Sequence, residues 1–151
     1  MKKIIPILFL HFILGGCVKS NVDCTSKTVQ SEQAQILAFA ASNGVTATAH
    51  SSGLYYQIVN QGSGPTPSLT SKIFVTYTGQ LMNGTTFDSK TNVSFMMNTV
   101  IPGWQTGLPL IQKGGAIKLI VPSSMAYGCH GFGTVPADAV LYFEITLLDV
   151  Q

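Results

Sequence analysis

Arginine is absent from this sequence of 151 residues, and charged residues of all kinds make up only 9% of it. Apart from Lys2 and Lys3, six lysines stand against six acidic residues. So few basic residues cannot form a patch that neutralises a phosphate backbone, and we expect no binding of nucleic acid. The lack of arginine also removes the planar clamp that proteins commonly use for carboxylate or phosphate substrates.

Cysteine and histidine are scarce as well, with three of each. Only Cys129 and His130 are adjacent, which is half of an ordinary metal site, and His50 is distant in sequence. We therefore expect no metal ion. No phosphate-binding loop, serine–histidine–aspartate arrangement or pair of catalytic carboxylates stands out, so we expect no cofactor either.

The longest apolar run near the amino terminus, residues 4–14, is too short to span a bilayer as a permanent helix. We interpret residues 1–16 as a targeting segment. Its end, Leu14-Gly15-Gly16-Cys17, resembles a bacterial lipobox, which implies a lipoprotein signal peptide and a lipid anchor on Cys17 at the cell envelope. Val18 is not the aspartate that retains some lipoproteins at the inner membrane, which favours the outer membrane, facing the periplasm. The alternative is an ordinary signal peptide followed by a coincidental cysteine.

Residues 17–30 are polar and predict a flexible tether. Residues 31–44 predict a short helical extension, with Ser31 able to cap its start and Asn43-Gly44 suited to its end. Its apolar side chains fall on adjacent helical rows, so we expect this helix to pack on the following domain or on a partner.

Residues 45–151 predict a mostly antiparallel β domain. Alternation of apolar and polar residues between turn-forming segments predicts strands over residues 53–59, 72–82, 93–96, 116–121 and 141–150. Asn83-Gly84 is a strong hairpin signal. One short helix after Pro102 would lie across one face of the sheet, which gives an α+β domain.

The only tryptophan lies in the stretch Val100-Ile101-Pro102-Gly103-Trp104. Pro102 is suited to the first position of a helix, and Gly103 allows close approach of neighbouring backbone. Trp104 would then point from the first helical turn into the space that the strands enclose. We interpret its indole as the floor of an apolar pocket, although a lone tryptophan can equally be an ordinary core residue.

Five motifs occur in order and with compatible spacing over residues 53–151. They are Val75-Thr76-Tyr77-Thr78-Gly79, Gly84 through Phe87-Asp88-Ser89, the stretch around Trp104, Ala126-Tyr127-Gly128, and Leu141-Tyr142-Phe143-Glu144-Ile145. Together they resemble the FKBP-type peptidyl-prolyl cis-trans isomerases, and the leader and helix are similar to the periplasmic lipoprotein members. The resemblance implies an FKBP-like twisted antiparallel sheet wrapped around one short α-helix, acting on proline-containing polypeptide clients. In longer members an N-terminal helical region mediates dimerisation.

The resemblance also implies which residues form the site. Its catalytic positions fall on Tyr77, Asp88 and Tyr127, and its substrate-binding positions on Phe87, Val100, Ile101, Trp104, Val135 and Phe143. The prolyl ring would rest on the Trp104 indole. The Ile101 N–H and the Tyr127 hydroxyl would donate hydrogen bonds to peptide carbonyls, Asp88 would lie at the rim, and Val135 would close over the ligand.

An apolar pocket suits this reaction because rotation about an X–Pro amide needs no covalent intermediate. The barrier is ~18–20 kcal/mol, and water stabilises the planar, polar amide more than the twisted one. Excluding water and holding the flanking backbone therefore favours the twisted state. A reduction of about 6 kcal/mol would accelerate rotation by roughly four decades.

Other interpretations of the same residues remain open. Tyr77, Phe87 and Phe143 could be ordinary core residues, Asp88 a turn or helix cap, and Tyr127 a loop aromatic without a ligand. The chain could instead be a module that binds proline segments with little turnover, or a structural surface lipoprotein.

Two features depart from common relatives. Val93 occupies a position where well-known members carry a second aromatic residue, so we expect weaker binding of large macrolide inhibitors. The loop over residues 129–134 is unusual and overhangs the expected site, so we expect it to set substrate preference. If Cys17 is acylated, Cys24 and Cys129 could form a disulfide that folds the tether back across the site, or remain free or intermolecular thiols.

Overall fold

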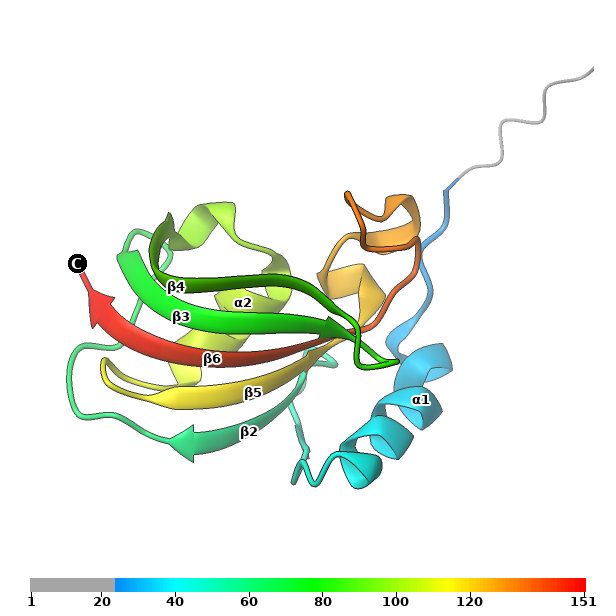
Figure 1. Cartoon of the computed structure of the whole chain (residues 1–151), viewed down its shortest axis with the longest axis horizontal. Coiled ribbons are helices and arrows are strands. Elements are labelled where there is room, and N and C mark those ends of the chain that lie inside the picture. Colours follow the sequence, from blue (N-terminus) through cyan, green and yellow to red (C-terminus); the bar gives the residue numbers. More distant parts are fainter. Residues whose placement is uncertain (1–23) are drawn as a thin grey trace, which may run out of the picture.

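The computed structural model describes residues 24–151, so the predicted signal peptide and Cys17 lie outside the described residues. One antiparallel sheet has the strand order β1-β2-β5-β6-β3-β4 (Figure 1). The strands are β1 (Thr48–Ala49), β2 (Tyr55–Asn60), β3 (Lys72–Leu81), β4 (Thr86–Met96), β5 (Ala116–Val121) and β6 (Leu141–Val150). Helix α2 (Pro102–Gly107) lies against one face of the sheet, and α1 (Val29–Ser42) lies at one end (Figure 1). This arrangement confirms the predicted α+β class.

The main core lies between the central strands and α2. Alternate residues of β3 and β6 are buried on the side of α2, as the period of a strand requires. They pack against the helical region, and the core cluster includes Ile73, Val75, Tyr77, Phe143, Ile145, Leu147, Trp104, Leu108 and Ile111. Burial of a large apolar side chain contributes about 1.5–3 kcal/mol, so this layer fixes α2 on the sheet.

The β3–β4 hairpin turns at Asn83-Gly84 as predicted, with Gly84 at a φ of +84°. However, β4 begins at Thr86, whereas the sequence predicts a strand only from residue 93. Apart from the half-buried Phe87 and Asp88, its first half is polar and exposed because β4 is an edge strand, so no apolar alternation marks it. The two-residue strand β1 was not predicted either.

Helix α2 approaches the sheet closely because of its glycines. A Cβ atom on Gly103 would lie 2.4 Å from Val121 Cγ1, and one on Gly107 would lie 2.7 Å from Leu119 Cδ2. Both contacts are with β5, and no larger side chain fits without displacement. The close approach places Trp104, the next residue after Gly103, against the interior of the sheet.

Helix α1 packs on the opposite face of the sheet, within its own chain. Ile36, Phe39 and Ala40 are buried against residues that pair across β2, β5 and β6, namely Tyr55, Ile120 and Tyr142. The rings of Phe39 and Tyr142 are 5.1 Å apart. The predicted packing of this helix on the following domain is therefore confirmed.

The start of α1 differs from the prediction. Thr28, not Ser31, is the N-cap: its Oγ1 accepts a hydrogen bond from the Ser31 backbone N–H at 3.3 Å. The helix ends at Ser42, followed by the predicted stop at Asn43, and Gly44 has a φ of +63°. The predicted start at residue 31 was wrong because Thr28 and Ser31 both lie near this end, and threonine and serine can both cap a helix.

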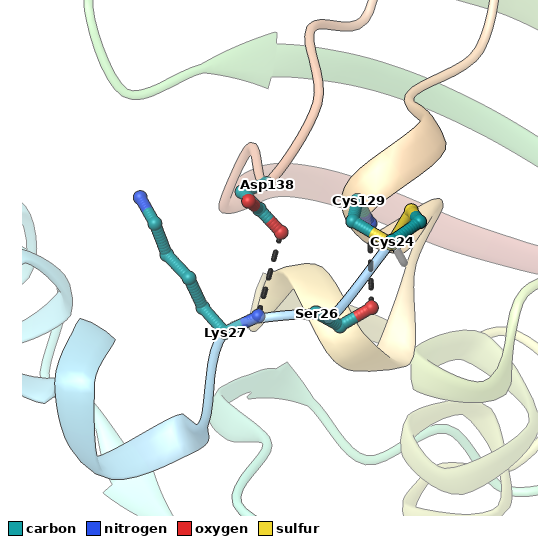
Figure 2. The surroundings of a disulfide bond; sticks show 5 residues. All are labelled: Cys24, Ser26, Lys27, Cys129 and Asp138. Carbon is teal, nitrogen blue, oxygen red and sulfur yellow. Dashed lines mark hydrogen bonds between the residues drawn. A yellow bond between two sulfur atoms is a disulfide. The ribbon is translucent and has the colours of Figure 1, made fainter. Parts of the chain in front are cut away.

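The predicted flexible tether over residues 17–30 is wrong for its described part, residues 24–30. Cys24 forms a disulfide with Cys129, and Ser26 Oγ accepts a hydrogen bond from the Cys129 N–H at 3.3 Å (Figure 2). Lys27 N donates to Asp138 Oδ1 at 3.4 Å (Figure 2). This segment is therefore fastened to the loop between β5 and β6. Within residues 24–151, no helix combines the length and apolarity needed to cross a membrane.

Candidate active site

A pocket of about 420 Å³ opens between α2, the β3–β4 hairpin, β6 and the loop that follows β5. Its lining residues are Tyr77, Phe87, Asp88, Phe95, Thr99, Val100, Ile101, Trp104, Tyr127, Phe132 and Phe143. The three predicted catalytic residues are all in this set, and so are all predicted substrate-binding residues except Val135. Residues that are up to 66 positions apart in sequence, Tyr77 and Phe143, thus face one cavity.

The floor of the pocket is the Trp104 indole, whose residue is only 4% exposed. Three aromatic rings stand nearly perpendicular to it. The ring centroids lie 5.0 Å away for Tyr77, 5.3 Å for Phe143 and 6.0 Å for Phe95, at interplanar angles of 83–85°. Edge-to-face contacts of this kind are favourable and leave the indole face framed by ring walls. Trp104 therefore belongs both to the core and to the pocket.

One wall depends on a glycine in β3. Phe87 and Phe143 meet edge to face, with centroids 5.6 Å apart, and Gly79 lies beneath them. A Cβ atom at Gly79 would lie 2.7 Å from Phe87 Cζ and 2.9 Å from Phe143 Cε1. Gly79 pairs in register with Asp88 on one side and with Phe143 on the other. The absence of a side chain at Gly79 allows both rings to occupy the wall.

Asp88 lies within β4 at the rim, so it is neither a turn residue nor a helix cap. The Tyr77 hydroxyl donates a short hydrogen bond to Asp88 Oδ2, and Lys90 Nζ lies 3.8 Å from Asp88 Oδ1. Burial first, and then the hydrogen bond and charge of Asp88, raise the pKa of Tyr77 well above its usual value. Tyr77 therefore remains a protonated phenol that holds the carboxylate in place.

Besides the buried Trp104 Nε1–H, which has no partner among the described residues, two hydrogen-bond donors on the pocket lining have no acceptor there. One is the Tyr127 hydroxyl, and burial followed by the nearby charge of Asp88 raises the pKa of Tyr127. The other is the backbone N–H of Ile101, the N-cap of α2, whose carbonyl accepts from Trp104 N at 2.9 Å. The Gln105 side chain holds the neighbouring Val100 carbonyl at 2.8 Å. These donors are therefore available to an acceptor from outside the protein.

Val135 lies beside the main pocket rather than in it. It is buried and lines a smaller adjoining hollow of about 180 Å³, which shares Phe87, Asp88, Tyr127 and Phe132 with the main pocket. Backbone hydrogen bonds in both directions join Val135 to Phe132. Val135 thus shapes the loop beside the ligand space.

Three lining residues, Phe95, Thr99 and Phe132, were not assigned to the site from the sequence. Phe132 is 69% exposed and stacks on Tyr127, with centroids 5.1 Å apart and an interplanar angle of 18°. Phe95 faces the pocket, whereas Val93 packs against the core and is not among the lining residues. Alternation along β4 could have identified Phe95, since Val93 and Phe95 are two residues apart. Phe132 lies in the loop over residues 129–134 that the sequence predicts to overhang the site, although no motif names this residue individually.

The disulfide lies behind the loop and does not fold the chain across the pocket. None of residues 24–30 lines the pocket, so that part of the prediction is wrong, although an intramolecular bridge does form. Ligand atoms of Cys24, Cys129 and His130 lie within 4.8 Å of one another. Because both sulfurs are joined in the disulfide, this group offers no thiolate to a metal ion.

Comparison with known proteins identifies relatives of this chain. The sequence profile of the FKBP-type peptidyl-prolyl cis-trans isomerases matches residues 64–148. The chain is 39% identical over 137 residues to the FKBP-type peptidyl-prolyl cis-trans isomerase FkpA of Aeromonas hydrophila, which covers 88% of this chain and 50% of that protein. It is 41% identical over 117 residues to FkpA of Escherichia coli K12, which covers 75% of this chain and 43% of that protein. The chain thus spans about half the length of these relatives.

Solved structures show the same fold. The crystal structure of FkpA from Escherichia coli superposes with a TM-score of 0.73 at 35% identity, covering 82% of this chain and 61% of that one. A peptidyl-prolyl cis-trans isomerase from Pseudomonas syringae pv. tomato superposes with a TM-score of 0.72 at 30% identity, covering 82% and 92%. The FKBP-like fold that the sequence predicts is therefore confirmed. The chain belongs to the FKBP-type peptidyl-prolyl cis-trans isomerase family.

Proposed function

We propose that this chain accelerates cis–trans rotation of X–Pro peptide bonds in protein clients. The observation that carries this proposal is the aromatic pocket over Trp104, with two free donors, the Tyr127 hydroxyl and the Ile101 N–H, on its lining. A prolyl ring stacked on the indole would be shielded from water by Tyr77 and Phe143. The two donors would hold the carbonyls that flank it.

The pocket would act by differential stabilisation rather than by covalent chemistry. The planar amide is the more polar state, so transfer from water into an aromatic cavity costs it more than it costs the twisted state. Fixed donors on either side keep the peptide backbone still while the amide turns. No group in the pocket has to gain or lose a proton, which agrees with the raised pKa of Tyr77 and Tyr127.

The test is a protease-coupled isomerisation assay on the purified, oxidised protein, with a p-nitroanilide tetrapeptide that contains one X–Pro bond. Tyr127→Phe removes a free donor and should lower kcat/KM, by about tenfold for loss of one well-placed hydrogen bond. Tyr56→Phe is the matched control, because Tyr56 lies on β2 and does not line the pocket. A macrolide inhibitor of this family should compete with the peptide.

The alternative function is a module that binds proline-containing segments with little turnover. It predicts that the peptide quenches Trp104 fluorescence while the rate of isomerisation stays at the uncatalysed value. A structural lipoprotein predicts neither binding nor acceleration. Either result would remove the proposed activity, and the two are told apart by the fluorescence titration.

We also propose that the protein is anchored to the bacterial cell envelope through lipid on Cys17 and acts on exported clients from the outer membrane, on its periplasmic side. The support is the apolar run of residues 4–14 followed by a lipobox-like Leu14-Gly15-Gly16-Cys17. Growth with labelled palmitate should label the wild-type protein and not a Cys17→Ser variant. Equal labelling of the two, or none, would contradict the anchor.

A further inference from the structure

The segment from Cys24 to Glu32 is fastened to the loop between β5 and β6 at three points. Glu32 contacts Ser123 where the loop begins, Cys24 is bonded to Cys129 in its middle, and Lys27 contacts Asp138 near its end. Figure 2 shows the second and third of these contacts side by side. This loop contains Tyr127, so the amino-terminal segment contacts the same loop that places the Tyr127 hydroxyl on the pocket lining.

The contact at the start of the loop uses a buried carboxylate. Glu32 is only 2% exposed, and its Oε2 accepts a hydrogen bond from the Ser123 backbone N–H at 2.9 Å. The other oxygen, Oε1, and the fully buried Ser123 hydroxyl have no partner among the described residues. Within the same residues, no lysine forms an ion pair with Glu32. A carboxylate in such surroundings loses hydration that one hydrogen bond only partly replaces, so burial of Glu32 costs stability.

The carboxylate caps a short helix that has no cap of its own. The 3₁₀ helix Ser123–Met125 begins after Pro122, whose side chain can make no capping hydrogen bond. Its first N–H group would be buried without an acceptor if Glu32 were absent. Glu32 on α1 supplies that acceptor from 91 residues away in sequence.

The capped turn leads directly to the pocket. Met125 N donates to the Pro122 carbonyl at 2.9 Å and Ala126 N to the Ser123 carbonyl at 3.0 Å, so two backbone hydrogen bonds close the turn. Tyr127 is the next residue. A shift at Ser123 would therefore move the Tyr127 hydroxyl.

We propose that Glu32 is a positioning residue for the isomerase site, acting through Ser123 to place the Tyr127 hydroxyl. This inference rests on the proposed function of the pocket. On this proposal α1, which lies outside the matched residues 64–148, supplies a residue that positions the site. Glu32 itself does not touch the pocket.

Three variants of the full chain test the proposal. Glu32→Met keeps the buried volume but leaves the Ser123 N–H without an acceptor, and it should lower kcat/KM by roughly tenfold. Glu32→Gln keeps an acceptor oxygen for the Ser123 N–H and removes the buried charge, so it should restore most of the loss. Gln35→Ala, an exposed position on the same helix, is the control and should leave kcat/KM unchanged.

A positioning role is separated from a structural one by non-additivity. In a Tyr127→Phe background the donor is already missing, so Glu32→Met should lower kcat/KM no further. Hydrogen exchange gives a second readout that needs no activity: the amides of residues 124–132 should exchange faster in Glu32→Met than in Gln35→Ala or the wild type. Circular dichroism confirms that each variant is folded.

The outcomes are decisive. Equal kcat/KM and equal exchange in Glu32→Met and Gln35→Ala would overturn the proposal, as would an undiminished effect of Glu32→Met in the Tyr127→Phe background. If Glu32→Met fails to fold while Glu32→Gln folds, Glu32 is a structural residue only and the proposal is wrong. An inactive wild type would instead overturn the proposed function, and exchange in the loop would still decide whether Glu32 positions it.

Discussion

The Tyr77 hydroxyl donates a hydrogen bond to the Asp88 carboxylate across the β3–β4 hairpin, at the rim of the pocket. Tyr77 also meets the Trp104 indole edge to face at 5.0 Å. The same residue therefore forms part of the apolar wall and fixes the one acidic group on the pocket lining. A carboxylate held in this way stays at the rim of the pocket and cannot turn freely into it.

Tyr77 and Asp88 should act as one unit in activity. We expect Tyr77→Phe and Asp88→Val each to lower kcat/KM by about tenfold, and the double variant to lower it little further, because each change breaks the same hydrogen bond. The measurement is a double-mutant cycle on kcat/KM, with urea unfolding to confirm that each protein is folded. Tyr56→Phe serves as the control for loss of a hydroxyl elsewhere. Losses that multiply in the double variant would contradict the coupling.

Between pH 6 and pH 9, kcat/KM should not change through ionisation of the two pocket tyrosines. Burial and the charge of Asp88 raise the pKa of Tyr77 and Tyr127 above their usual value of about 10, so both remain protonated over that range. A group whose pKa is raised by folding stabilises the protein fully below its unfolded pKa and loses that contribution as pH rises through the folded pKa. We therefore expect kcat/KM and stability to fall only above about pH 10.

The measurement is kcat/KM against pH, together with tyrosinate absorbance near 295 nm as an independent record of ionisation. Tyr127→Phe should remove part of the alkaline decline while leaving the neutral plateau shape unchanged. A decline centred near pH 8 that accompanies tyrosinate formation would contradict the raised pKa of these groups.

Gly79→Ala should damage the pocket more than the fold. The added Cβ would lie 2.7 Å from Phe87 and 2.9 Å from Phe143, so both rings must move toward the ligand space. We expect affinity for a proline peptide to fall by roughly tenfold and stability to fall by about 1–3 kcal/mol from overpacking. The measurements are peptide titration by Trp104 fluorescence and urea unfolding.

Gly64→Ala is the matched control for that change. Its Cβ would lie 2.7 Å from Lys113 Cβ, a similar overlap between residues that do not line the pocket. It should lower stability by a comparable amount and leave peptide affinity unchanged. Equal affinity in both variants would show that Gly79 does not determine the pocket wall.

The sequence predicts the central strands because one of their faces is buried. β3, β5 and β6 were placed to within one residue of their observed ends, since their apolar residues alternate or run continuously. The first half of β4 was missed because it lies at the exposed edge, where pairing with β3 makes the strand and no apolar pattern records it. Tertiary pairing, rather than local preference, decides such segments.

The pocket was predicted largely from motif order, whereas its supports were not. Trp104, Tyr77 and Phe143 each lie within one of the recognised motifs. Glu32 and Ser123, by contrast, are 91 residues apart and neither belongs to a motif. The sequence also left undecided whether Cys24 and Cys129 form a disulfide, because cysteine spacing alone does not report which side chains the fold brings together. Contacts of long sequence separation become visible only in the folded chain.

The disulfide between Cys24 and Cys129 should be a major contributor to stability. It closes a loop with a sequence separation of 105 residues, for which the chain-entropy estimate is about 4.7 kcal/mol and common measured values are about 2–4 kcal/mol. We expect a Cys24→Ser/Cys129→Ser double variant to lose free energy of unfolding in that range, measured by urea denaturation. The wild type in reductant should match the double variant, which itself should not respond to reductant. In the double variant Glu32 still holds Ser123 at the start of the loop, so the folded protein should keep Tyr127 near the pocket and retain isomerase activity. A fall in activity much larger than the fall in folded fraction would mean that the disulfide, and not the buried carboxylate, places the loop.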